Sequence, residues 1–164
     1  MKSLSLTIHS SSTILPSHPT PHRTLPLSEC DQMTLEGHVF TFYVYKPSNN
    51  NTSSPISIDS LRTSLSQILV PYYPVAGRLR WTPCDRLELH CCAAGACFIE
   101  AKATTKLDDH NNFESCDVTV TKQLIPSVDY EAPIHEQPVL LVQVTRFACG
   151  GIVIGTALSH FLID

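Results

Sequence analysis

The sequence has no long apolar run, no cluster of basic residues and no pair of cysteines with metal-ligand spacing. A transmembrane helix needs about 20 consecutive apolar residues, and no stretch of this chain approaches that length. The first residues lack the continuous apolar core of a secretory signal peptide. With a net charge of −4, the chain also lacks the basic footprint of a nucleic-acid-binding protein. These absences predict a protein that binds neither nucleic acid nor membranes.

Seven cysteines are present, and their spacing excludes two common uses. No two of them form a C-x-x-C pair, which argues against a zinc ribbon and against a thioredoxin-like redox motif. The absence of a signal peptide favours reduced thiols over disulfides. We therefore expect a cytoplasmic protein without a metal site, whose thiols are Cys30, Cys84, Cys91, Cys92, Cys97, Cys116 and Cys149.

The chain is long enough for one globular domain, with 164 residues of which 43% are hydrophobic and 16% charged. Residues 3–15 and 39–45 are predicted strands, because they alternate in polarity or gather β-branched and aromatic residues. Residues 57–70 are the one clear helix, ended by Pro71. The apolar face of that helix consists of Ile58, Leu61, Leu65, Ile68 and Leu69.

Two further segments, 86–91 and 97–103, are predicted to pair as strands around a turn at Ala93–Gly95. Many strands with one clear helix indicate an α+β domain. We expect the helix to pack on one face of a mixed β-sheet.

The C-terminal segment 137–164 organises the rest of the chain. Two β-branched runs, 139–147 and 152–158, flank Gly150 and Gly151, whose freedom to adopt positive φ predicts a hairpin. The second run ends at His160, four residues before Asp164. In a chain with this many His and Asp residues, chance gives about 0.4 H-x-x-x-D spacings, so the motif alone identifies nothing. Without other context, His160 is the polar end of a strand.

The order of short sequence segments resembles that of the N-terminal half of the plant BAHD acyltransferases. The matching segments run in the same order along nearly the whole chain. They are 20–21 followed by 27–28 and Asp31, 64–80 (SLSQILVPYYPVAGRLR), 87–91 with 98–101, 123–126, 143–145 with 149–151, and 159–164 (SHFLID). Residues 76–81 and 87–101 are most similar to hydroxycinnamoyl transferases of the spermidine type, and next to the shikimate or quinate type.

This resemblance implies transfer of an acyl group from coenzyme A to an amine or alcohol, with acyl-CoA as a co-substrate and no bound cofactor. A base must take the proton of the attacking N–H or O–H, and an imidazole with an ordinary pKa of ~6.5 is mostly neutral at pH 7. By resemblance, His160 is that general base and Asp164 has a structural role. The family forms no acyl-enzyme, so Ser159 and Cys149 need not be nucleophiles. Complete members are usually monomeric.

The family pattern continues past the H-x-x-x-D motif with a glycine and later a second domain that carries a D-F-G-W-G motif. We therefore expect residues 1–164 to be the N-terminal acyltransferase domain, truncated at this motif, with the second domain absent. The fold should be half of a chloramphenicol-acetyltransferase-like two-domain fold. The alternative is a catalytically inert remnant that acts at most as a binding domain. A hydrolase using His160 and Cys149 is a third, weaker hypothesis.

Overall fold

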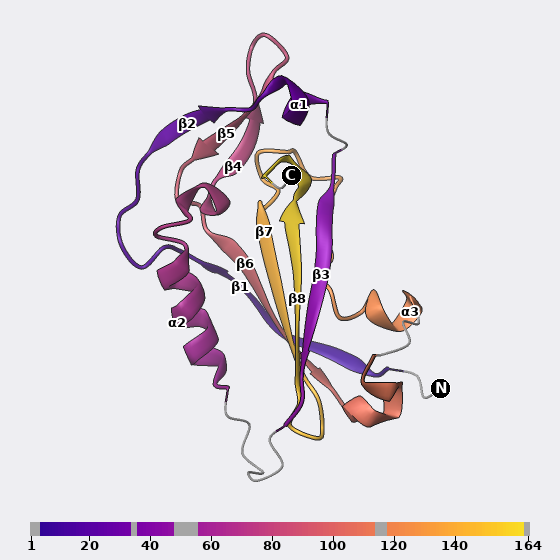
Figure 1. Ribbon diagram of the computed structural model, residues 1–164. Helices are drawn as coiled ribbons and strands as arrows, with labels where there is room; N and C mark the ends of the chain where they lie inside the picture. Colours follow the sequence, from indigo (N-terminus) through magenta and orange to yellow (C-terminus); the bar gives the residue numbers. More distant parts are fainter. Residues whose placement is uncertain (1–3, 34–35, 48–55, 114–117, 163–164) are drawn as a thin grey trace.

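The computed structural model describes residues 4–33, 36–47, 56–113 and 118–162. Strands dominate this part of the chain (Figure 1). In order, the elements are β1 (Leu6–Ile14), β2 (Arg23–Pro26), α1 (Glu29–Gln32), β3 (His38–Tyr45), α2 (Ile58–Ile68), η1 (Tyr73–Ala76), β4 (Arg78–Trp81), β5 (Leu87–Cys91), β6 (Ala96–Ala103), η2 (Leu107–Phe113), α3 (Val118–Thr121), β7 (Leu140–Arg146), β8 (Ile152–Ser159) and η3 (His160–Leu162). No helix among the described residues is long and apolar enough to cross a membrane.

The strands form two sheets. The larger has five strands in the order β1-β6-β7-β8-β3, and the smaller has three in the order β2-β5-β4. Only the β6–β7 pair of the large sheet is parallel, so the expected mixed sheet is confirmed. The small sheet lies beyond the end of the large sheet at which β7 begins and β8 ends (Figure 1).

The predicted pairing of 86–91 with 97–103 is wrong, because β5 and β6 belong to different sheets. The connection between them is not a hairpin turn. Ala93 and Gly95 both have positive φ, and the Gly95 N–H donates to the Ala76 carbonyl at 3.0 Å. A Cβ at Gly95 would lie 2.5 Å from the Ile14 carbonyl oxygen, so only glycine fits there. The connection therefore carries the chain from the small sheet into the large one.

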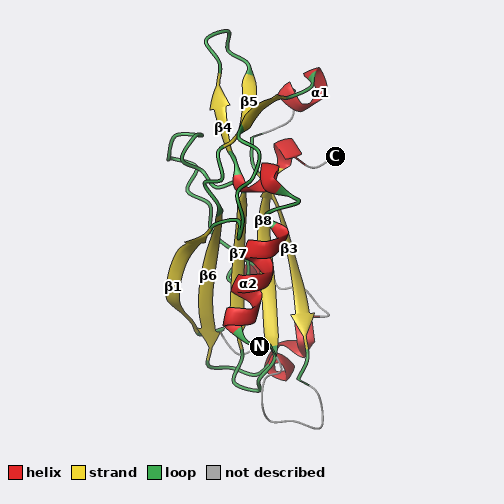
Figure 2. Cartoon of the chain, turned by 90° about the vertical axis from the view of Figure 1, so that its left-hand side faces the viewer, coloured by secondary structure: helices red, strands yellow, loops and turns green. Residues whose placement is uncertain are grey.

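Helix α2 packs on one face of the large sheet, as predicted (Figure 2). Ser57 caps its start, because the Ser57 hydroxyl accepts a hydrogen bond from the Asp59 N–H at 3.2 Å. The helix side chains that pack against Phe98, Val142 and Val144 of the sheet are Ile58, Leu61 and Leu65. One expected member of this stripe, Ile68, is instead 48% exposed, because it lies in the last turn and points away from the sheet.

The other face of the large sheet is covered by the chain between β6 and β7. Its core contains Leu107, Val120 and Leu124 from that connection, packed against Val153 of β8 and against Phe147, which follows β7. Gln143, also buried, donates from its amide nitrogen to the Gln123 carbonyl at 2.8 Å. The large sheet is thus sandwiched between α2 and this connection, which makes β8 a rigid interior strand.

Candidate active site

The predicted hairpin is confirmed, with β7 and β8 antiparallel in the register that pairs Leu140 with Leu158. Its two glycines act differently. Gly150 has φ +84° and supplies the turn, whereas Gly151 is not in the positive-φ region. A Cβ at Gly151 would meet the end of the Leu107 side chain, so a larger residue there would require Leu107 to move.

The side chains of β8 alternate between a closed face and a partly open one. Val153 and Ala157 are 0% exposed and Ser159 is 2% exposed on the closed face. Thr156 and Leu158 on the other face are only partly buried, and His160, at the end of this series, is exposed. The structure therefore presents His160 to solvent and buries Ser159, which fits a bystander role for the serine.

The backbone at His160 is held from both sides. The His160 N–H donates to the Gly37 carbonyl at 3.0 Å, just before β3, and the Ser159 N–H donates to the Val139 carbonyl at 2.8 Å, just before β7. The next residue in the chain, Phe161, is 7% exposed and packs among Leu79, Leu87 and Leu89 of the small sheet. His160 thus lies between two buried residues, at the junction of the two sheets (Figure 1).

A polar strip on β3 lies on the same open face. Register pairs Thr41 with Thr156 and Val39 with Leu158, so these side chains share one side of the sheet. The two threonine hydroxyl oxygens are 2.7 Å apart. Tyr43 follows on the same face and is 59% exposed. The strip leads along the sheet toward His160.

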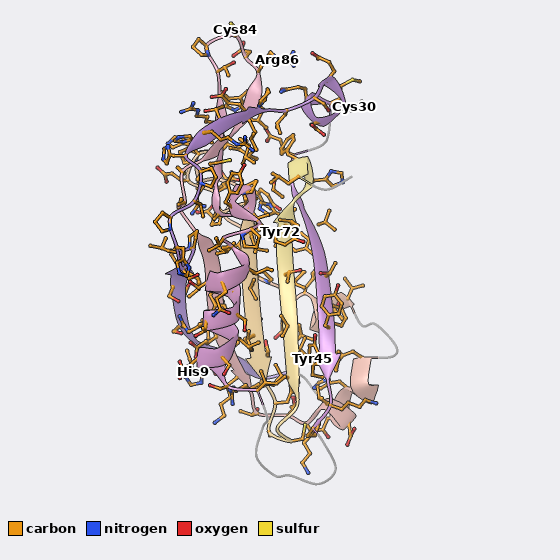
Figure 3. The ribbon with its side chains drawn as sticks, turned by 60° about the vertical axis from the view of Figure 1, so that its left-hand side comes forward. His9, Cys30, Tyr45, Tyr72, Cys84 and Arg86 are labelled. Atoms are coloured by element: carbon orange, nitrogen blue, oxygen red, sulfur yellow. The ribbon has the colours of Figure 1, made fainter. Side chains whose placement is uncertain are left out.

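Sequence reasoning had used residues 39–45 only as a strand and missed this strip. Its signal was available in the period-two placement of the hydroxyl-bearing residues Thr41, Tyr43 and Tyr45. The choice of face required the register with β8, which is set by residues more than a hundred positions away. Tyr45 marks the end of this strip that is remote from the small sheet (Figure 3).

The hydrolase hypothesis is wrong, because His160 and Cys149 lie at opposite ends of β8. Cys149 belongs to the turn before the strand, where its sulfur accepts a hydrogen bond from the Leu107 N–H at 3.5 Å. A strand of eight residues separates the two side chains by roughly 25 Å. No direct proton transfer between them is possible.

The remaining predicted site residue, Asp164, lies outside the described residues, so its structural role stays a prediction. Within the described ranges, no group of His, Cys, Asp and Glu side chains is arranged to hold a metal ion. Cys84, Cys91, Cys92, Cys97 and Cys149 carry free thiols. Cys84 marks the tip of the β4–β5 hairpin (Figure 3).

Relatives with described activities match nearly all of this chain. A hydroxycinnamoyl-CoA:piscidic acid hydroxycinnamoyltransferase of Actaea racemosa is 46% identical over 96% of the chain. A spermidine coumaroyl-CoA acyltransferase of Arabidopsis thaliana is 38% identical over 92% of it. The chain spans about a third of the length of these relatives, 34% and 33% respectively.

The fold matches as well. The crystal structure of vinorine synthase superposes with a TM-score of 0.78 at 29% identity, over 98% of this chain and 39% of that one. The two-sheet arrangement described above is therefore one part of a larger known fold, as the resemblance implied. The profile of the Transferase family matches residues 4–164. The chain belongs to this family, that of the BAHD acyltransferases.

Proposed function

We propose that residues 1–164 form the N-terminal domain of an acyltransferase that moves a hydroxycinnamoyl-type group from coenzyme A to an amine or alcohol. The observation that carries this proposal is the position of His160. It is exposed, it follows a rigid interior strand, and its neighbours Ser159 and Phe161 are both buried. A base in that place is fixed in the backbone yet accessible to substrate.

In the proposed reaction, His160 takes the proton of the acceptor N–H or O–H while the acceptor atom attacks the thioester carbonyl carbon. The tetrahedral intermediate collapses by breaking the carbon–sulfur bond. The imidazolium then returns the proton to the departing thiolate, so the products are the acyl amide or ester and free coenzyme A. No residue of the chain becomes acylated, which agrees with the burial of Ser159 and the remoteness of Cys149.

Acceptor groups can reach His160 along the strip of Thr41, Thr156 and Tyr43. Its hydroxyls provide donors and acceptors of hydrogen bonds without fixed charge. Spermidine and shikimate are the acceptors we propose first, and the name of the Actaea relative adds piscidic acid. We place the reaction in the cytoplasm, with acyl-CoA as a diffusing co-substrate. Asp164 is proposed to stabilise the backbone that follows His160.

The proposal is tested with a joined enzyme. Residues 1–164 are joined to the C-terminal part of the Actaea relative, which is 46% identical over the shared region. The joined enzyme is assayed with coumaroyl-CoA and spermidine, shikimate or piscidic acid, by release of free thiol. The Actaea enzyme is the positive control. A folded joined enzyme that is inactive with every acceptor, beside an active control, contradicts the proposed function.

The 164-residue chain assayed by itself tests the alternative hypothesis that it is catalytically inert. Most of an enzyme's rate acceleration comes from positioning the reactants and stabilising developing charge, whereas a base contributes only part of it. Since His160 is exposed, we expect no measurable acyl transfer by the 164-residue chain alone. Thiol release above that of a His160→Ala control would show that this part suffices.

A further inference from the structure

A second histidine, His38, lies next to the backbone of the proposed base, with its side chain on the sheet face of Ser159. The family match assigns it no role. It is the first residue of β3, is partly buried, and is paired in register with Ser159. Its Nε2 lies 3.0 Å from the Pro138 carbonyl oxygen and its Nδ1 lies 3.2 Å from the Tyr130 hydroxyl. Both ring nitrogens therefore have a partner.

The proton positions on this ring follow from the partners. A carbonyl oxygen only accepts, so Nε2 of His38 carries the hydrogen and donates to Pro138. In a neutral ring Nδ1 is then an acceptor, and the Tyr130 hydroxyl donates to it. Burial lowers the pKa of His38, partly offset by the hydrogen bond to the Pro138 carbonyl, which favours this neutral form.

Three hydrogen bonds then close a ring around the end of β8. Gly37 accepts from the His160 N–H, Val139 accepts from the Ser159 N–H, and Pro138 accepts from the His38 side chain. The residues in each of the pairs 37–38, 138–139 and 159–160 are adjacent in the chain. Because β8 lies between β7 and β3, the His38 side chain spans the end of β8 and ties its two neighbours together.

A pocket borders this set of hydrogen bonds. It has a volume of about 50 Å³ and is lined among others by Gly37, His38, Tyr130, Pro138 and Ser159. That volume is enough for at least one water molecule. Because side chains do not fill this pocket, the hydrogen bonds contribute to holding the strand ends together. The Tyr130 ring lies beside the His38 imidazole, with 5.7 Å between the ring centroids.

We propose that His38 is a positioning residue that fixes the backbone of His160 by tying residue 138 to the start of β3, with Tyr130 orienting its ring. This inference rests on the proposed role of His160 as the base. Loss of the tie lets the strand ends separate, and a displacement of about 1 Å at a catalytic group can cost 10²-fold in rate.

Three variants test the tie. His38→Leu removes both hydrogen bonds, whereas His38→Gln offers an amide N–H to Pro138 and an amide oxygen to Tyr130. Tyr130→Phe removes only the exposed hydroxyl. In the joined enzyme we expect His38→Leu to lower kcat roughly 10- to 100-fold with little change in KM. His38→Gln should recover most of this loss, and Tyr130→Phe should lower kcat a few-fold.

A second measurement does not depend on activity. In the 164-residue chain, amide hydrogen exchange at Ser159 and His160 should be about fivefold faster in His38→Leu, because the lost hydrogen bond to the Pro138 carbonyl no longer holds the strand ends together. Exchange at Val144, in the middle of β7, should not change.

The two measurements separate the two proposals. If the joined enzyme is inactive but exchange at His160 is faster in His38→Leu, the proposed function is contradicted. The role of His38 in holding the strand ends together is then still supported. An active joined enzyme in which His38→Leu retains its kcat overturns the positioning role, whatever the exchange shows. Unchanged exchange at His160 also overturns it. Should His38→Leu fail to fold, a Tyr130→Phe enzyme with the kcat of the wild type overturns it.

Discussion

The two faces of β8 differ in what they contact and in what they offer. The closed face carries Val153, Gly155 and Ala157, packed against the connection between β6 and β7 so closely that Gly155 has no space for a side chain. The open face carries Thr156 and leads to His160, with the β3 edge beside it.

The difference shows how one strand combines a closely packed face with an accessible one. Close packing on one face fixes the strand, so the other face can remain accessible without losing order. Helix α2 packs against Ile152 and Ile154 at the beginning of β8, whereas Leu158 near its end packs against the core cluster of the small sheet. Substitutions on the closed face should therefore lower stability more than activity. Substitutions on the open face should lower activity more than stability.

The largest effect is expected from His160→Ala in the joined enzyme. Loss of a general base should lower turnover by ~10²–10⁴. Because the side chain is exposed, the free energy of unfolding should change by less than about 0.5 kcal/mol. Turnover and chemical denaturation measured on the same preparation check both statements. Near-normal turnover would remove His160 from the mechanism.

Gly155→Ala should have the opposite profile. Its new Cβ would collide with the Leu124 carbonyl oxygen and lie 3.0 Å from the Ile125 Cα, and a backbone cannot rotate aside as a side chain does. We expect a loss of about 3 kcal/mol or more in the free energy of unfolding. Denaturation of the 164-residue chain measures it. A loss of less than about 1 kcal/mol would contradict the packing argument.

Val153→Ala and Thr156→Ala form a pair of nearly equal truncations on opposite faces. Val153 is fully buried among Leu107, Leu124 and Phe147, so its truncation should cost about 2 kcal/mol. Thr156→Ala loses only the hydroxyl pair with Thr41 and should cost less than about 1 kcal/mol. Urea denaturation of both variants makes the comparison. A larger loss for Thr156→Ala would show that the open face is covered in solution.

The smallest effect concerns pH and the Arg62–Glu100 pair, which joins α2 to the open face. The hydrogen bond from Arg62 lowers the pKa of the Glu100 carboxyl below its ordinary value of 4.5. A carboxyl with a lowered folded pKa stabilises the protein fully above its ordinary pKa, and the stabilisation is lost as the pH falls through the folded value.

Glu100→Gln should therefore be less stable than the wild type by about 0.5–1 kcal/mol at pH 7. The difference should shrink as the pH falls below the ordinary carboxyl pKa. Thermal denaturation of both proteins between pH 7 and pH 3 measures it. A difference that is constant over this range would mean that the carboxylate charge contributes nothing.

Local sequence pattern predicted those elements that local chemistry determines. Ser57 before an apolar stripe identified α2, and Gly150 with its flanking β-branched runs identified the hairpin. The pairing of 86–91 with 97–103 failed because a turn-like sequence does not say whether the chain reverses within a sheet or passes to another. That choice was made by distant contacts of Gly95 with Ala76 and Ile14.

The site was predictable only in part for the same reason. His160 stood out because a family resemblance singled it out from the other histidines. His38 did not, since its partners Pro138 and Tyr130 are about a hundred residues away in the chain. The local sequence around a histidine at the start of a strand does not predict which carbonyl group it contacts.

The pairing of β3 with β8 also has a consequence for synthesis on the ribosome. Among the described strands β3 pairs only with β8, and the paired residues Thr41 and Thr156 are 115 positions apart. At about 5–20 residues per second, β3 leaves the ribosome roughly 6–23 seconds before its partner. During that time Phe42 and Val44, which are packed in the finished core, have no sheet to join. The nascent chain is therefore most prone to aggregation before residues 152–159 emerge.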